Sequence, residues 1–224
     1  MKAEVEIRIP TEKGKKLRGE FYPPNDKDNF PAVLTLVGHR STYKRRYYQE
    51  IAANLVKKGI GNLLFNYRGH GEDEESYSQY GFLDWLCDSR LALDWLLKQK
   101  KVDKKRIGML GVSMGGALAG QLLSQNNEII SLILRAPADS NLYVKVLKKS
   151  SSYINQFKGD YLLILSEKDE LFPLEREKEL FWNQALSSSK KLCILKEASH
   201  SLVKKEWQDE FIAASLEWFF KTLG

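Results

Sequence analysis

Apolar runs typical of buried strands alternate with helical patterns along the chain, and this alternation constrains the fold more than any other feature. The run at 32–37, Ala-Val-Leu-Thr-Leu-Val, is nearly all apolar, as expected for a strand covered on both faces. Apolar residues at helical spacing follow over 47–55, and Gly59 then provides a helix stop. Strands separated by helices predict an α/β fold, with a mostly parallel, twisted sheet of about eight strands and helices on both faces. Ligands of such sheets bind at the carboxyl ends of the strands.

The same two periodicities locate the other elements. Further strands are predicted at 2–10, 15–22, 62–67, 106–112, 129–135, 161–165 and 192–195. Further helices are predicted at 82–97, 114–124 and 142–157, and over 207–218 near the C-terminus.

The length and composition allow one globular domain. The chain has 224 residues, of which 43% are hydrophobic and 29% charged. No repeat, low-complexity segment or linker interrupts it, so we expect one domain over residues 1–224. No run approaches the ~20 apolar residues of a membrane helix, and residues 1–10 alternate like a strand instead of forming a signal-peptide core. We therefore expect a cytoplasmic protein without a membrane partner.

Charge, cysteine and histidine content narrow the range of partners. The net charge of +6 arises from scattered Lys and Arg clusters without a basic recognition helix, so we expect no nucleic-acid partner. Cys87 and Cys193 are far apart and flanked by apolar residues, which favours buried free thiols over a disulfide. The three histidines, His39, His70 and His200, show no metal-ligand spacing. We expect neither a metal nor a cofactor.

One segment has the spacing of a serine nucleophile. Gly111, Ser113 and Gly115 form a Gly-x-Ser-x-Gly motif between a predicted strand and a predicted helix, the context of a nucleophile elbow. The chain must turn sharply there, and the two glycines let the turn close and leave the hydroxyl exposed. The backbone N–H of Met114, at the start of the helix, would point to where an oxyanion forms. A phosphate-binding loop is disfavoured because its glycine and lysine pattern is absent from the segment.

A serine nucleophile needs a base and an acid that orients the base, and the chain has a candidate for each farther along. Asp169 lies just past the predicted strand 161–165, in an acidic loop closed by proline. His200 lies just past the predicted strand 192–195. The order Ser113, Asp169, His200 is the one found in nucleophile-elbow enzymes.

Together these segments resemble the α/β-hydrolase superfamily, in particular its small serine esterases and dienelactone-hydrolase-like members. The resemblance covers nearly the whole chain and implies an α/β-hydrolase fold. It also implies Ser113 as nucleophile, His200 as general base and acid, and Asp169 as the residue that holds the imidazole, with the Met114 N–H as one oxyanion-hole donor. The segments that carry it, in order, are Lys16-Leu17-Arg18-Gly19, Tyr67-Arg68-Gly69-His70-Gly71-Glu72, residues 111–117, Lys168-Asp169 and Ala198-Ser199-His200.

The second oxyanion-hole donor is less well defined by the resemblance. Relatives usually carry His-Gly followed by the donor residue after the first core strand, whereas this chain has Val-Gly-His-Arg at 37–40. Alignment on Gly38 implies the backbone N–H of His39, and the N–H of Arg40 is an alternative.

The triad acid also has an alternative. Asp139 follows the predicted strand 129–135, a position that some relatives use. Asp169 is favoured because its loop matches a Lys-Asp-x-x-x-Pro pattern and leads in order to His200.

The resemblance implies hydrolysis of carboxylic esters through an acyl-enzyme. A lid in this fold is usually inserted between the strands predicted at 129–135 and 161–165, where only the predicted helix 142–157 lies. We therefore expect a minimal lid that roofs the pocket partly, and small-molecule substrates with short or exposed acyl groups. Thioesterase, lactone hydrolase and peptidase activities are alternatives with the same triad, and a non-catalytic binding protein of this fold is an alternative of another class. The sequence leaves the oligomeric state open.

Overall fold

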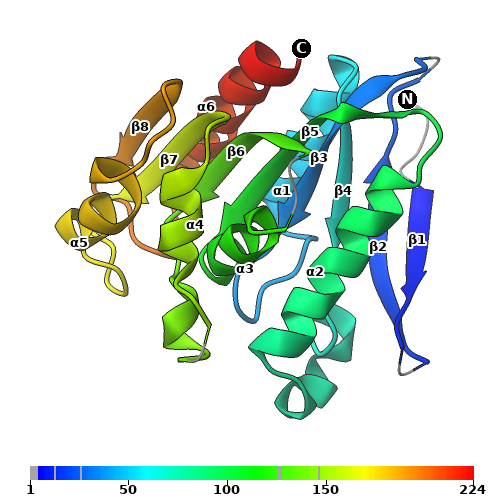
Figure 1. Ribbon diagram of the computed structural model, residues 1–224, viewed down its shortest axis with the longest axis horizontal. Coiled ribbons are helices and arrows are strands. Elements are labelled where there is room, and N and C mark those ends of the chain that lie inside the picture. Colours follow the sequence, from blue (N-terminus) through cyan, green and yellow to red (C-terminus); the bar gives the residue numbers. More distant parts are fainter. Residues whose placement is uncertain (1–4, 13, 26, 126–127, 146) are drawn as a thin grey trace.

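The computed structural model describes residues 5–12, 14–25, 27–125, 128–145 and 147–224, apart from the side chains of residues 73–75. An eight-stranded sheet in the order β1-β2-β4-β3-β5-β6-β7-β8 forms its centre (Figure 1). The pairs β1–β2 and β2–β4 are antiparallel, and the pairs from β4–β3 to β7–β8 are parallel. The strands are β1 (Val5–Pro10), β2 (Lys16–Tyr22), β3 (Phe30–Leu36), β4 (Gly61–Phe65), β5 (Val102–Val112), β6 (Ile129–Arg135), β7 (Asp160–Ser166) and β8 (Lys190–Leu195).

Helices cover both faces of this sheet. The pair α1 and α6 packs together on one face, while α2, α3 and α4 lie on the other (Figure 1). The α-helices are α1 (Arg46–Lys57), α2 (Phe82–Leu97), α3 (Met114–Leu123), α4 (Ser150–Gln156), α5 (Leu174–Lys178) and α6 (Lys205–Leu223). Shorter helical segments are η1 (Gly71–Gln79), η2 (Ser140–Leu142) and η3 (Glu179–Asn183).

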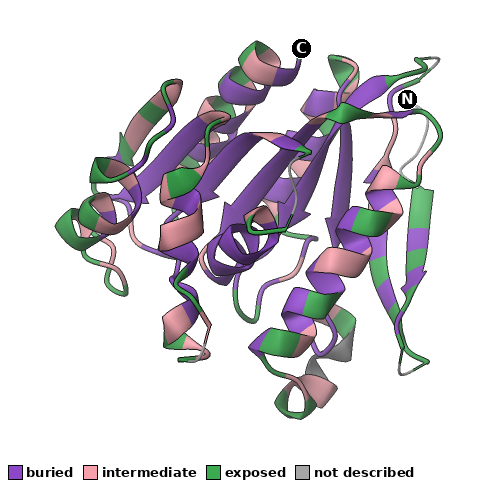
Figure 2. Cartoon of the chain, viewed as in Figure 1, coloured by how far each residue is buried: buried purple, intermediate pink, exposed green. Residues whose placement is uncertain are grey.

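The central strands form the core, as Figure 2 shows by their burial. Every residue of β3 and β4 is buried, because α1 covers one side of the sheet and α2 and α3 cover the other. The edge strand β1 instead alternates buried and exposed residues, as expected for a strand with one solvated face. The predicted α/β sheet with helices on both faces is therefore confirmed.

The predicted helix 142–157 is wrong. The chain forms the short turn η2, and only α4 is helical in the second half of that range. The carboxylate of Asp139 accepts hydrogen bonds from the Ser150 N–H (2.7 Å) and the Ser151 hydroxyl (2.6 Å), which places the start of α4. Gly120 lets Ser150 pack tightly on α3, since a Cβ there would lie 2.6 Å from the Ser150 Cβ. The segment thus packs down on α3.

The prediction of two buried thiols is also wrong, although both cysteines are free. Cys87 is exposed because it shares the outer stripe of α2 with Leu83 and Asp94. Cys193 is half-buried because it lies on the edge strand β8. Apolar neighbours in sequence say little about burial when the periodicity of the element turns the side chain outward. Among the described residues, no helix is both long and apolar enough to span a membrane.

Candidate active site

Ser113 lies on the sharp turn between β5 and α3, at the carboxyl edge of the sheet. Its backbone adopts φ 53° and ψ −116°, a conformation that costs a non-glycine residue about 1–3 kcal/mol. Surrounding hydrogen bonds hold it there: the Ser113 N–H donates to the Arg135 carbonyl (3.0 Å), and its own carbonyl accepts from Ala138 (2.9 Å). A Cβ on Gly115 would collide with the Leu36 carbonyl, so the close approach of this turn to β3 requires glycine.

The side chains of Ser113, His200 and Asp169 form a chain of hydrogen bonds. The Nε2 atom of His200 lies 3.0 Å from the Ser113 Oγ, and its Nδ1 lies 2.8 Å from Oδ2 of Asp169. A carboxylate at Nδ1 favours the tautomer with a proton on that nitrogen, which leaves Nε2 free to accept the serine proton. The three residues come from the ends of β5, β7 and β8, which meet at one edge of the sheet.

The Asp169 carboxylate is held in its charged form. Burial alone would raise its pKa, but hydrogen bonds from the His200 ring and from the Phe172 N–H (2.8 Å) outweigh burial and keep the pKa below its usual value. The other backbone donor is Leu171, at 2.9 Å. The turn after β7 therefore orients the carboxylate toward the histidine.

Arg135, at the end of β6, supports the loop that carries His200. Its guanidinium donates to the carbonyl oxygens of His200 and Ser199 and, at 2.8 Å, to the hydroxyl of Ser166. On the other side, the His200 N–H donates to a carboxylate oxygen of Glu170 at 2.9 Å. These contacts fix the backbone from which the imidazole projects.

Asp139, the alternative acid, points elsewhere. Its two carboxylate oxygens are taken by Ser150 and Ser151 at the start of α4. In the part of the chain that the structure describes, it makes no hydrogen bond with His200, whose Nδ1 faces Asp169.

Hydrogen bonding distinguishes the two candidate oxyanion donors of the 37–40 loop, the N–H groups of His39 and Arg40. Gly38 packs against Ser113, where a Cβ would lie 3.5 Å from the serine Cβ. The Arg40 N–H already donates to Nε2 of His70 at 3.3 Å. By contrast, the N–H groups of His39 and Met114 have no hydrogen-bond partner among the described residues. Of the two candidates, His39 is thus the one whose amide has no partner among the described residues.

A pocket of about 90 Å³ opens beside Ser113. His39, which lines this pocket, packs beside other aromatic rings. The centroid of its ring lies 5.9 Å from that of Trp85 and 6.3 Å from that of Tyr143. Burial, and secondarily the charge of Arg40, lowers the pKa of His39. The pocket is lined by Gly38, His39, Ser41, Arg45, Tyr47, Tyr48, Val112, Ser113, Arg135, His200 and Ser201.

Sequence reasoning missed several of these lining residues. Three of them, Arg45, Tyr47 and Tyr48, lie at the start of α1, and their sequence pattern indicates only the beginning of a helix. The sequence did offer one signal for Arg135, because a charged residue at the end of a mostly apolar buried strand is unusual.

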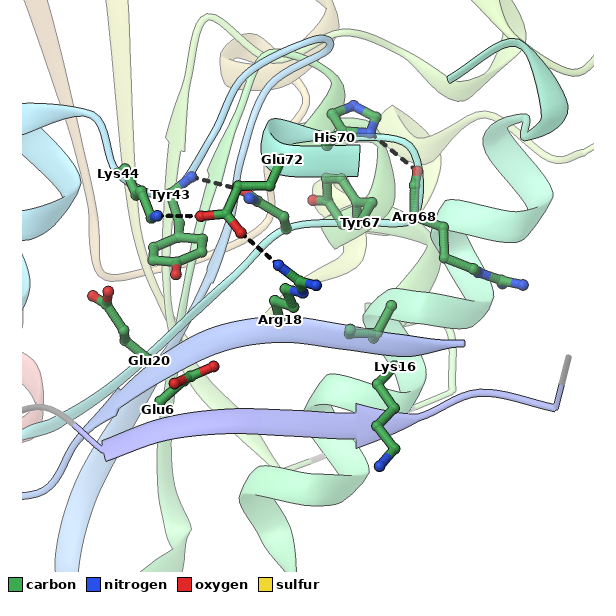
Figure 3. Close-up of a pocket in the computed structure, with 12 residues that line it drawn as sticks. Glu6, Lys16, Arg18, Glu20, Tyr43, Lys44, Tyr67, Arg68, His70 and Glu72 are labelled. Carbon is green, nitrogen blue, oxygen red and sulfur yellow. Dashed lines mark hydrogen bonds and ion pairs between the residues drawn. The ribbon is translucent and has the colours of Figure 1, made fainter. Parts of the chain in front are cut away.

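A second, larger cavity of about 380 Å³ lies between β2 and the 66–72 turn (Figure 3). The carboxylate of Glu72 bridges Arg18 (2.6 Å) and Lys44 (2.5 Å) across it. None of the three residues of the Ser113 hydrogen-bond chain lines this cavity. Within the described residues, no cluster of three His, Cys, Asp or Glu side chains could hold a metal ion.

These features define an α/β hydrolase. They are the strand order, the strained serine between β5 and α3, and the histidine and aspartate that follow later strands. A family model described as Serine aminopeptidase, S33 matches residues 31–150, more than half of the chain. The chain therefore belongs to this hydrolase family.

Several known proteins are similar in sequence. An uncharacterized protein of Mycobacterium tuberculosis is 34% identical over 135 residues, which cover 60% of this chain and 46% of that protein. The acylamino-acid-releasing enzyme of Rattus norvegicus is 25% identical over 241 residues, covering 90% of this chain and 32% of the enzyme. The chain thus spans less than half the length of these relatives.

Solved structures share the fold across nearly the whole chain. Est1E from Butyrivibrio proteoclasticus, solved with ferulic acid bound, has a TM-score of 0.81 at 18% identity and covers 96% of this chain and 98% of its own. A dienelactone hydrolase from Anabaena variabilis has a TM-score of 0.79 at 21% identity and covers 99% of each chain. At these identities the likeness establishes the fold.

Proposed function

We propose that this hydrolase is a serine esterase in which Ser113, His200 and Asp169 form the catalytic triad. The observation that carries the proposal is the chain of hydrogen bonds from Ser113 Oγ through the His200 ring to Asp169, at 3.0 and 2.8 Å. Such a chain lets a neutral imidazole take the serine proton as the oxygen attacks a carbonyl carbon.

The proposed reaction has two acyl-transfer steps. Ser113 Oγ attacks the ester carbonyl and His200 takes its proton, which gives a tetrahedral oxyanion held by the N–H groups of His39 and Met114. His200 then protonates the departing alcohol, leaving an acyl-serine. Water attacks this intermediate with His200 again as base, and the acid leaves as Ser113 regains its proton. Asp169 stays ionised and stabilises the imidazolium in both steps.

The surroundings of Ser113 favour short or exposed acyl groups. The pocket beside Ser113 has a volume of about 90 Å³, which suits a short acyl group better than a long alkyl chain. The segment between β6 and β7 packs on α3, and α4 buries Ile154 instead of roofing the pocket. Either a small ester or an acyl group at the surface of a larger molecule could therefore reach the serine.

Replacing the nucleophile tests the proposal. Ser113→Ala should lower the hydrolysis of short p-nitrophenyl esters by several orders of magnitude, since the acyl-enzyme cannot form, with the circular dichroism spectrum unchanged. A fluorophosphonate should label the native chain at Ser113 and leave the variant unlabelled. Undiminished turnover by the variant would contradict the triad, and a native chain that neither turns over nor reacts would indicate a binding protein.

A second candidate is cleavage of amide bonds next to acyl groups. It is favoured by the similarity to the acylamino-acid-releasing enzyme, which extends over 90% of this chain, and by the aminopeptidase description of the family. Acyl-amino-acid p-nitroanilides assayed beside esters, thioesters and lactones of the same acyl group would distinguish the two. A larger kcat/KM for the anilide than for the matched ester would favour the peptidase.

A further inference from the structure

Two buried side chains in the reaction pocket have polar hydrogens without a protein partner. Arg135 is 2% exposed and uses its terminal nitrogens on Ser166, Ser199 and His200, while its Nε has no partner among the described residues. Tyr48 is 1% exposed, lines the same pocket, and has a hydroxyl that is likewise unpartnered there. Burying such donors unpaired is costly, so a ligand that accepts from them would be stabilised.

Positive charge at this pocket is not neutralised by direct contacts. Neither Arg135 nor Arg45 forms an ion pair among the described residues, and Arg45 donates only through Nε to the Ser41 hydroxyl, at 3.0 Å. The carboxylates of Asp169 and Glu170 act on Arg135 from a greater distance. Both are already engaged with His200, one at its ring and the other at its backbone N–H.

The positive surface continues outward from the pocket. Ser41 and Arg45 also line an adjoining cleft of about 300 Å³, together with Arg40 and Lys44. Glu72 lines the cleft as well, but its carboxylate is bound to Lys44 and Arg18. Arg40 stacks over the Tyr77 ring, 4.5 Å from its centroid, and makes no ion pair in the described part of the chain. An anion approaching Ser113 therefore passes arginines at the mouth before it meets the buried donors.

We propose that the pocket beside Ser113 is a carboxylate subsite formed by Arg45, Arg135 and Tyr48, and that the substrates are short esters that carry a carboxylate. The inference rests on the proposed esterase function and adds its substrate class. The terminal nitrogens of Arg45 have the fork geometry that binds a carboxylate through two parallel hydrogen bonds. A volume of about 90 Å³ holds a carboxylate on a short chain. Either the acid or the alcohol part of the ester could carry this group.

Two matched pairs of esters test the subsite. Methyl hydrogen glutarate against methyl pentanoate places the charge on the acyl side, and 4-acetoxybenzoate against phenyl acetate places it on the alcohol side. In one pair, the anionic ester should have a kcat/KM about tenfold or more above that of its neutral partner, as expected for hydrogen bonds to a charged group. The pair that shows the preference identifies the side that enters the pocket.

Two variants and one control test whether Arg45 and Tyr48 cause the preference for anionic esters. Arg45→Gln should lower the anionic-to-neutral ratio by about tenfold, and Tyr48→Phe should lower it without changing the charge. Arg46→Gln removes the same charge one residue away, where the guanidinium is paired with Glu50 (2.7 Å), and should leave the ratio unchanged.

The subsite is excluded if the anionic ester is not preferred over its neutral partner in either pair, or if Arg45→Gln and Arg46→Gln lower the ratio equally. Ser113-dependent cleavage of neutral esters alone would overturn the subsite and leave the esterase proposal standing. A chain that cleaves no ester would overturn both.

Discussion

Asp139 and Asp169 follow neighbouring strands, and their hydrogen-bond partners separate their roles. Asp139 is buried and holds the first turn of α4 through Ser150 and Ser151. Asp169, whose side chain is 1% exposed, accepts from two backbone amides and from the ring of His200. A carboxylate with such donors stays ionised, whereas an amide in its place would offer the wrong group to Nδ1.

Isosteric replacement distinguishes the two carboxylates. Asp169→Asn should lower kcat by roughly 10³–10⁴-fold, because the imidazole loses the tautomer and orientation set by the carboxylate. Asp139→Asn should instead lower the free energy of unfolding by about 1–3 kcal/mol, with kcat close to that of the native chain. Steady-state ester hydrolysis and urea unfolding on both variants measure the two effects. The reverse ranking of kcat would move the acid to Asp139.

The 66–72 turn supports the loop that carries the proposed oxyanion amide. His70, which is 2% exposed, accepts the Arg40 N–H at Nε2 and contacts the Arg68 carbonyl through Nδ1 at 3.3 Å. Tyr67 donates its hydroxyl to the Val37 carbonyl at 3.3 Å. Burial lowers the pKa of His70 to about 4, so the ring is neutral at ordinary assay pH and can accept a hydrogen bond. The turn thus positions residues 37–40 through hydrogen bonds to Val37 and Arg40.

Loss of the acceptor at His70 should weaken catalysis through this loop. In His70→Phe the Arg40 N–H loses its acceptor and the 37–40 loop loses this anchor, so kcat should fall about tenfold with a smaller change in KM. His70→Gln keeps an acceptor and should recover most of kcat. Equal losses in both variants would show that packing of the ring, and not the hydrogen bond, is what matters.

At the scale of the whole molecule, the buried carboxyl group of Glu177 couples the stability of the fold to pH. Glu177 of α5 is 3% exposed, and one carboxylate oxygen has no hydrogen-bond partner among the described residues. Burial raises its pKa to about 8, with Asp169 and Asp139 adding to the increase and Arg176 opposing it. The unfolded chain loses this proton above about pH 4.5, whereas the folded chain keeps it until about pH 8. Rising pH between these values therefore favours unfolding.

Replacing Glu177 should flatten the pH dependence of stability. Its ionisation can lower the free energy of unfolding by up to about 1.4 kcal/mol per pH unit in that window, and Glu177→Gln removes this contribution. Urea unfolding from pH 5 to pH 9 should show the variant gaining stability over the native chain as pH rises. Glu179→Gln, on the exposed side of the next turn, is the matched control and should parallel the native curve. A Glu177→Gln curve that also runs parallel would place the coupling elsewhere.

The sequence by itself determined the succession of strands and helices, because periodicity and apolar runs are local properties. It predicted α2 and β6 with the bounds that the structure has, and it located Ser113 between a strand and a helix. It failed at 142–157, where contacts of Asp139 and Gly120 break the helix, and at Cys87, which faces outward.

Only the tertiary structure decided which groups meet around Ser113. Contacts between elements far apart in the chain decide that His200 faces Asp169 and not Asp139. They also decide that the Arg40 N–H donates to His70 and that Arg135 lies in the pocket. Such contacts follow from strand register and from the course of each loop, and no local pattern of residues encodes either.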